Sequence, residues 1–260
     1  RRAGGASKEK DGEMMDITWA IIAAIIIILI GALIQGLAGF GFSQFAIPLL
    51  VLFIASGELI PIMVFLSLFL NILMISDLRK DVNIRRIWPL MAGGIFGIPL
   101  GTYLLMVADA NHLKILIGAL IFVFGLAQLL EIKKQLEEER FAMLPIGFTG
   151  GVLQGSVSMS GPPLILFFSN QGFTKQQFRA SLIAFFLFMN IATLPIYLLA
   201  GLWTPSVMST SIMLLPGLVV GTLIGARFSR KVPEAKFKNF VLILVMVFGC
   251  MSIASGLGAF

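Results

Sequence analysis

The sequence QGLAGFGFSQ, residues 35–44, interrupts one long apolar run, and QGSVSMSGPP, residues 154–163, interrupts another. The two interruptions start 119 residues apart (154 − 35), and Asn190 follows Asn71 by the same number (190 − 71). A polar, glycine-rich interruption that recurs at matched positions of two apolar halves is typical of secondary transporters, whose binding site lies between internal repeats. The repeat therefore predicts both a duplicated fold and the place of a site.

The composition indicates a membrane protein. Of the 260 residues, 58% are hydrophobic and 12% are charged, whereas soluble domains carry about 25% charged residues. Many apolar stretches reach the roughly 20 residues that an α-helix needs to cross a bilayer. We therefore predict an all-α polytopic membrane protein of the cell (inner) membrane, whose net charge of +6 reflects Lys and Arg in cytoplasmic loops.

The apolar segments fall into two halves of about five each. In each half the first two segments run together across the interruption, which predicts a broken helix or a re-entrant hairpin. The charged stretch 131–141 is expected to be a cytoplasmic linker between a first repeat, residues 17–130, and a second, residues 142–260. Residues 1–16 are small and polar, so we expect a disordered tail. The predicted segments are 17–36, 37–55, 58–77, 87–107, 112–130, 142–157, 158–172, 180–200, 206–228 and 236–257.

The distribution of Lys and Arg predicts that the two repeats are inverted. Basic loops at 79–86 and 227–238 should be cytoplasmic, whereas loops at 108–112 and 200–206 carry no Lys or Arg and should face outward. Loop 79–86 of the first half aligns with loop 200–206 of the second, so equivalent loops lie on opposite sides. Arg179, beside the cytoplasmic end of a segment, is expected as a loop residue to set this topology rather than to draw anions inward.

Glycines at every fourth residue mark one segment in each half. Such a stripe leaves one helix face flat, so a neighbouring backbone can approach closely, and we predict tight helix packing there. The matched glycines are Gly93, Gly97 and Gly101 in the first half and Gly217, Gly221 and Gly225 in the second.

The interruptions are expected to break their helices. Each glycine in a helix interior weakens the helix by about 1 kcal/mol relative to Ala. In the second half Ser160 is predicted near the N-cap of a new helix and Pro162 near its first position, with Ser43 as the weaker cap in the first half. Two helix starts that meet inside a membrane direct free N–H groups and positive dipole ends at one spot, which suits an anion.

The candidate substrate-binding residues are those of the two interruptions together with the matched asparagines. They are Gln35, Gly36, Gly39, Gly41, Ser43, Gln44, Asn71, Gln154, Ser156, Ser158, Ser160, Gly161, Pro162 and Asn190. Two simpler interpretations stay open, because serines in membrane helices often bond their own backbone and asparagines often link neighbouring helices.

Other classes of function find little support in the sequence. There is one cysteine, Cys250, and one histidine, His112, and no Asp or Glu lies deep within an apolar segment. We therefore expect no enzyme activity, metal site, cofactor, intrachain disulfide or proton relay through a buried carboxylate. The scattered basic residues form no nucleic-acid surface. The expected partners are a small anionic substrate and the lipid bilayer, while coupling to H⁺ or Na⁺ and a homodimer stay open.

The motifs also resemble those of a known family. Two glycine motifs, Gly36-x-x-Gly39-x-Gly41 ahead of Pro48 and Gly151-x-x-x-Gly155 ahead of Gly161-Pro162-Pro163, resemble the duplicated motifs of the TauE/SafE sulfite exporter family of anion transporters. The resemblance spans residues 17–257 and implies transport, often outward, of sulfite, sulfoacetate or a related oxyanion. An anion channel and a transporter of a small carboxylate remain alternatives. Many members have glycines where this chain has Phe42-Ser43-Gln44 and a serine-rich run at 156–160, which leaves the particular substrate open.

Overall fold

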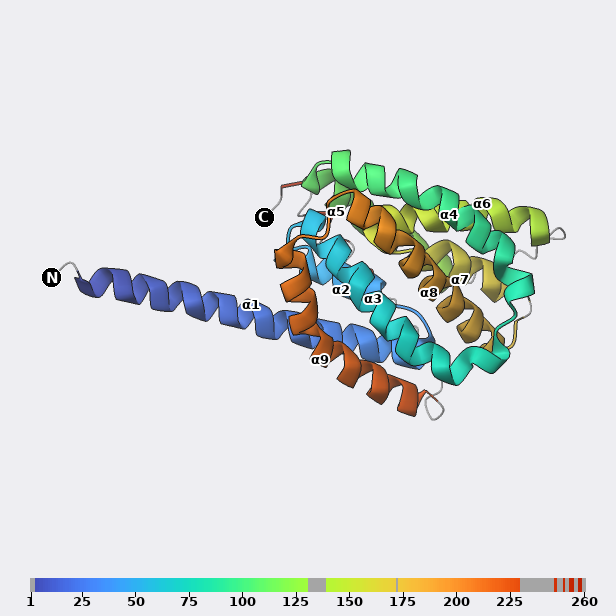
Figure 1. Cartoon of the computed structure of the whole chain (residues 1–260), viewed down its shortest axis with the longest axis horizontal. Coiled ribbons are helices and arrows are strands. Elements are labelled where there is room, and N and C mark those ends of the chain that lie inside the picture. Colours follow the sequence, from blue (N-terminus) through green and yellow to red (C-terminus); the bar gives the residue numbers. More distant parts are fainter. Residues whose placement is uncertain are drawn as a thin grey trace.

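The described residues form helices joined by short turns and irregular segments, with no strand among them. The structure is a computed structural model that describes residues 3–130, 139–171 and 173–229 together with positions 246, 250, 253, 254, 257 and 258. The helices pack as a bundle from which the N-terminal part of α1 projects (Figure 1). They are α1 (Ala3–Ala38), α2 (Phe42–Leu50), α3 (Ser56–Leu78), the 3-10 turn η1 (Arg79–Asp81), α4 (Ile84–Val107), α5 (Ala110–Leu129), α6 (Glu139–Val157), α7 (Gly161–Asn170), α8 (Lys175–Leu199) and α9 (Pro205–Phe228).

Five helices of the described residues are long and apolar enough to cross a bilayer. These spans lie on α1, α3, α4, α8 and α9 and contain at least 20 residues each, which is the length that a bilayer requires. Large apolar side chains point outward from them, such as Phe96, which is 73% exposed, and Leu199, which is 90% exposed. Exposed apolar surface of this kind marks contact with a membrane. The chain is therefore an all-α, multi-pass membrane protein, as the sequence predicts.

Two other helices, α2 and α7, are too short to cross. They contain nine and ten residues, which at 1.5 Å per residue is about 15 Å, half of the roughly 30 Å hydrocarbon core. The sequence predicts longer segments, 37–55 and 158–172, because apolar residues continue on both sides of these helices. Left-handed backbone at Gly39, Gly41 and Ser158 ends the preceding helices and sets the short ones apart.

The longest helix interfaces join the two halves of the chain. Helix α1 lies along α9, and α4 lies along α6 (Figure 1). By the sequence offsets, α6 is the counterpart of α1 and α9 is the counterpart of α4. Each interface therefore joins the first helix of one half to the fourth helix of the other, and the two halves make equivalent contacts.

Glycine permits the close approach at both interfaces. A Cβ atom added at Gly97 would collide with the carbonyl oxygen of Phe148, and one at Gly221 would collide with the carbonyl oxygen of Leu29. Phe148 follows Leu29 by 119 residues (148 − 29), and Gly221 follows Gly97 by 124 (221 − 97). The predicted tight packing at the glycine stripes is confirmed, and the contacts on the two sides are equivalent residue by residue.

The ends of the two repeats differ from the sequence expectation or lie outside the described residues. In place of the disordered tail predicted for residues 1–16, residues 3–16 form the first turns of α1, since Lys, Glu and Met favour helices and no proline interrupts them. Helix α6 already begins at Glu139, inside the predicted linker 131–141, and residues 131–138 lie outside the described residues. Most of the last predicted segment, 236–257, also lies outside the described residues.

Candidate functional site

The first break lies between α1 and α2. Gly39 has φ 87° and Gly41 has φ 109°, and both angles fall in the left-handed region that glycine adopts readily. Gly41, and not Ser43, occupies the N-cap position of α2, so the predicted cap is wrong. The backbone N–H of Phe42 instead donates a hydrogen bond to Oε1 of Gln35 at 3.2 Å. A side chain from the end of α1 thus caps the start of α2, because an N-terminal N–H has no partner within its own helix.

The second break lies between α6 and α7. Ser158 has φ 53° and occupies the position equivalent to Gly39, since 158 − 39 is 119. Ser160 is the N-cap residue of α7 and proline follows in the first turn, which confirms the predicted start of this helix. The Ser160 hydroxyl makes no capping bond. It donates to Oε1 of Gln154 at 3.0 Å.

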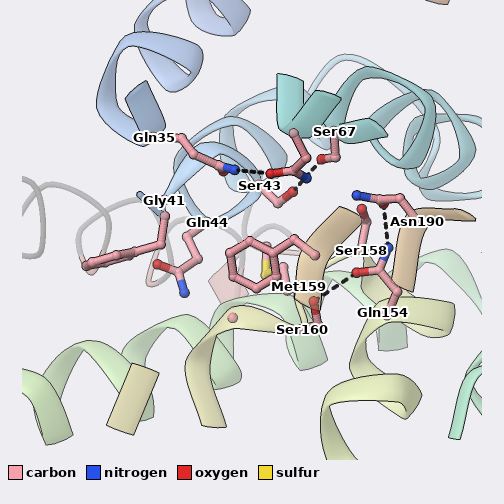
Figure 2. A pocket seen from close by; sticks show the side chains of 14 residues that line it. Gln35, Gly41, Ser43, Gln44, Ser67, Gln154, Ser158, Met159, Ser160 and Asn190 are labelled. Atoms are coloured by element: carbon pink, nitrogen blue, oxygen red, sulfur yellow. Dashed lines mark hydrogen bonds between the residues drawn. The ribbon is translucent and has the colours of Figure 1, made fainter. Parts of the chain in front are cut away.

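Two matched hydrogen-bond chains run from the breaks to the asparagines. Nε2 of Gln35 donates to Oδ1 of Asn71 at 3.0 Å, and Nε2 of Gln154 donates to Oδ1 of Asn190 at 2.8 Å. The Oε1 atom of each glutamine accepts from its own break, as described above. Because both asparagine oxygens are engaged as acceptors, each asparagine retains its Nδ2 group as a donor. Figure 2 shows the Asn190 amide nitrogen directed away from Gln154.

The two chains end at a single small cavity, which we call the central cavity (Figure 2). Its volume is about 30 Å³, larger than the roughly 10–15 Å³ that one water molecule needs. The breaks meet here, because a Cβ atom added at Gly161 would lie 3.4 Å from Nε2 of Gln44. The lining carries no charged side chain. It consists of Gln35, Phe40, Gly41, Ser43, Gln44, Ser67, Asn71, Gln154, Ser158, Met159, Ser160, Gly161, Phe186 and Asn190.

Most of the predicted site residues line this cavity. The ten that do are Gln35, Gly41, Ser43, Gln44, Asn71, Gln154, Ser158, Ser160, Gly161 and Asn190.

Four predicted residues lie elsewhere. A Cβ atom on Gly36 would lie 2.9 Å from the Cα atom of Gly225 in α9, and one on Gly39 would lie 2.9 Å from Cγ of Arg179. The Ser156 hydroxyl donates to the carbonyl of Val152 at 2.7 Å, the backbone bond that serines often make in membrane helices. Pro162 belongs to the first turn of α7 and is not part of the cavity lining.

Four further lining residues were not among the predicted ones. Ser67 and Phe186 each lie four residues before a matched asparagine, and residues four apart share a helix face. That spacing is the signal that would have found them. Phe40 and Met159 lie inside the breaks themselves, at equivalent positions (159 − 40 is 119).

Arg179 has a different role from the one its sequence position suggests. It lies in the second turn of α8 and is only 5% exposed, so it is not a loop residue. Its Nη2 atom donates to the carbonyl of Gly36 at 2.9 Å, near the C-terminal end of α1, where carbonyls lose their helical partners. The equivalent carbonyl, that of Gly155 in α6, accepts from the Tyr197 hydroxyl at 2.7 Å. Both bonds come from α8.

A second cavity lies at the end of the bundle where η1 meets α8 and α9, and we call it the basic-end cavity after Arg79, Lys80 and Arg227, which adjoin its lining residues in the sequence and do not line it themselves. Its volume is about 240 Å³, and its lining includes Arg179. The remaining lining residues are Met74, Asp77, Leu78, Asp81, Gln176, Ala226 and Ser229. On α3, Met74 and Leu78 continue the helix face that carries Asn71 in the central cavity, because residues three, four and seven apart share a face. The two cavities therefore follow one face of α3 at successive depths.

Comparison with known proteins identifies one family. The model of the family described as sulfite exporter TauE/SafE matches residues 23–252. No curated protein and no solved structure matches the chain. Within the described residues, no group of three or more His, Cys, Asp or Glu side chains is placed to hold a metal ion.

Proposed function

Because the chain belongs to the TauE/SafE sulfite exporter family, we propose that it is a secondary transporter that moves a small organosulfur or related oxyanion, such as sulfite or sulfoacetate, and that the central cavity is its binding site. Family membership makes it an anion transporter of the sulfite exporter type. The substrate, the site and the mechanism are the proposal.

The observation that carries the proposal is the pair of matched hydrogen-bond chains. In each chain the oxygen acceptors are already used within the protein, so the terminal groups that remain at the cavity are the Nδ2 donors of Asn71 and Asn190. A cavity that offers donors suits a ligand that offers only acceptors, and a deprotonated oxyanion is such a ligand. The other polar groups of the lining, on Ser43, Gln44, Ser67 and Ser158, can donate as well as accept.

The electrostatics of the site favour an anion that can leave again. Helices α2 and α7 both start at the central cavity, and the positive end of a helix dipole favours negative charge by about 0.3–1 kcal/mol. No arginine or lysine lines this cavity. A carrier must release its substrate on the other side, and neutral donors hold an anion less tightly than a charged pair does.

An alternating-access mechanism follows from inverted repeats. The positive-inside rule places the loop at 79–86 in the cytoplasm and the loop at 200–206 outside. The basic-end cavity lies on the same face of α3 as the central cavity, and in the proposed mechanism the anion reaches the cytoplasm through it, past Arg179, which offsets part of the negative charge of Asp77 and Asp81 in its lining. In this scheme the α1–α9 and α4–α6 interfaces, which are flat because of their glycines, are the surfaces along which one half moves against the other.

Two alternatives are tested together with the proposal. An anion channel needs a continuous pore with several weak sites, and the small volume of the central cavity, about 30 Å³, favours a carrier. A small carboxylate also offers only acceptors and would satisfy the same donors.

The test is a set of currents recorded from proteoliposomes on solid-supported membranes. Concentration jumps of sulfite, sulfoacetate, methanesulfonate, sulfate, lactate and chloride are applied with and without Na⁺ and pH gradients. We expect a saturable response to at least one sulfur oxyanion and acceleration of labelled uptake by the same anion inside the vesicle. Linear flux without such acceleration would indicate a channel, and a response to lactate alone would indicate a carboxylate carrier.

A further inference from the structure

Ser158 has a backbone conformation that serine normally avoids. Among the described residues it is the non-glycine residue with a positive φ, 53°, a region where the Cβ atom of an L-residue crowds the backbone. The equivalent position in the first half is Gly39, also left-handed with φ 87°. Glycine would thus satisfy the fold at position 158 without strain, and a serine there needs another explanation.

The hydroxyl of Ser158 has no hydrogen-bond partner among the described residues. The residue is 4% exposed, and its Oγ atom is buried without a hydrogen bond. A buried hydroxyl without a partner is unfavourable and rare. Because Ser158 lines the central cavity, the partner that its hydroxyl lacks belongs in that cavity.

A second unpartnered donor lines the same cavity from the other half of the chain. Asn71 is 1% exposed, and its Nδ2 atom is buried without a hydrogen bond. The bond from Gln35 to its Oδ1 atom fixes the amide so that Nδ2 cannot exchange places with the oxygen. Of the buried side-chain atoms without a partner in the described residues, those that line the central cavity belong to Asn71 and Ser158.

We propose that one oxygen of the transported oxyanion binds between Oγ of Ser158 and Nδ2 of Asn71. Ser158 then determines the affinity for the anion, and the first repeat has no equivalent hydroxyl. The central cavity has a volume of about 30 Å³, so a ligand group that fills it lies close to both donors. Gly39, at the position equivalent to Ser158, offers no side chain and faces Arg179. The two halves therefore bind the substrate unequally, and this inequality fixes the orientation of its head group. The inference rests on the proposed function.

The chain offers variants that separate the hydroxyl from the backbone strain. Ser158→Gly removes the hydroxyl and relieves the left-handed strain, whereas Ser158→Ala removes the hydroxyl and keeps the strain. Ser156→Ala removes a hydroxyl two residues away that bonds its own helix and does not line the cavity. Asn71→Asp keeps the acceptor for Gln35 and replaces the free donor by a negative oxygen.

The measurement is the Kd for sulfite, and for methanesulfonate, by isothermal titration of each purified variant in detergent under anaerobic buffer. We expect both Ser158 variants to raise the Kd about tenfold, which corresponds to about 1.4 kcal/mol, and Asn71→Asp to abolish measurable binding. Ser156→Ala should bind as the wild type does. Without ligand, Ser158→Gly should unfold at a temperature no lower than the wild type, which shows that a weaker Kd is not a folding defect.

The possible results have distinct meanings. Wild-type affinity in both Ser158 variants would overturn the inference and leave the proposed function standing. A weakened Kd in Ser158→Gly but not in Ser158→Ala would also overturn it, because the change in backbone freedom rather than the loss of the hydroxyl would then be responsible. A wild-type protein that binds neither anion would overturn the inference together with the sulfur-oxyanion function.

Discussion

At the scale of the residue, the carbonyls of Gly36 and Gly155 illustrate how equivalent positions receive different partners. Both belong to the last turn of the helix that precedes a break, and both accept a hydrogen bond from α8. The guanidinium of Arg179 donates the first bond, and the phenol of Tyr197 donates the second. The residues 119 positions earlier, Ile60 and Leu78 in α3, have no side-chain donor. Helix α8 thus holds the ends of both α1 and α6.

We expect Arg179→Met to destabilise the protein by about 1–3 kcal/mol, since it keeps the apolar stem and leaves the buried Gly36 carbonyl without its donor. Thermal unfolding in detergent measures the change. The matched control is Arg227→Met, the same substitution at an exposed arginine of α9, where the effect should stay within about 0.5 kcal/mol. Equal effects of the two substitutions would show that the bond to Gly36 contributes nothing.

At the scale of the element, the glycine interfaces hold the two halves together. The carbonyl oxygens of Leu29 and Phe148 occupy the places that Cβ atoms of Gly221 and Gly97 would take. Such contacts are van der Waals contacts between backbones, which is the main attraction available to helices in lipid. Any side chain at these glycines forces the helices apart.

We therefore expect Gly97→Ala and Gly221→Ala each to destabilise the protein by about 1–3 kcal/mol, as overpacking generally does. Their effects should be similar, because the two interfaces use equivalent residues. Gly57→Ala is the control: it lies in the first turn of α3 and its added Cβ would meet nothing within 4 Å, so it should be neutral or stabilising. Unfolding temperatures that are alike for all three variants would contradict the packing argument.

The elements also show how far the sequence determines the site. The shared offset of 119 residues pairs Gln35 with Gln154 and Asn71 with Asn190, and the structure gives both pairs the same hydrogen bond. The breaks themselves follow from glycine, serine and proline, whose local preferences need no tertiary information. These features were predictable because they depend on spacing and on local chemistry.

Features that depend on distant partners were not predictable. Sequence alone does not distinguish a glycine that bends the backbone, such as Gly41, from one that admits a neighbouring helix, such as Gly36. The cap of α2 comes from Gln35, seven residues away, and not from the adjacent Ser43. Arg179 looks like a loop residue because it lies near a segment end, yet it is buried against the end of α1.

At the scale of the whole molecule, the two cavities make the ends of the bundle unequal. The basic-end cavity of about 240 Å³ contains Arg179 in its lining. At the opposite end Ile60, the counterpart of Arg179, and Tyr197, the counterpart of Leu78, are fully buried. Under the proposed alternating-access mechanism with a cytoplasmic basic end, this conformation is the state whose larger cavity faces the cytoplasm, and exchange of the two halves' conformations gives the outward state.

If the two repeats are inverted, as proposed, their equivalent ends face opposite sides of the membrane. In a Cys250→Ser background, Lys80→Cys in η1 and Ser206→Cys at the start of α9 place single thiols at exposed, equivalent ends of the two halves. A membrane-impermeant maleimide should label Ser206→Cys on intact cells and Lys80→Cys only after permeabilisation. Labelling of both thiols from the same side would contradict the inversion.

The central claim is that an anion binds in the central cavity during transport, and the sulfite-induced current of Asn190→Asp tests it most directly. The substitution preserves side-chain shape and the acceptor for Gln154 but turns the remaining donor into a negative oxygen at the cavity. We predict that Asn190→Asp reconstitutes normally and loses the saturable current by at least tenfold, while Ser156→Ala keeps it. A wild-type current in Asn190→Asp would contradict the account, because the carboxylate would replace a donor that is proposed to contact the bound anion.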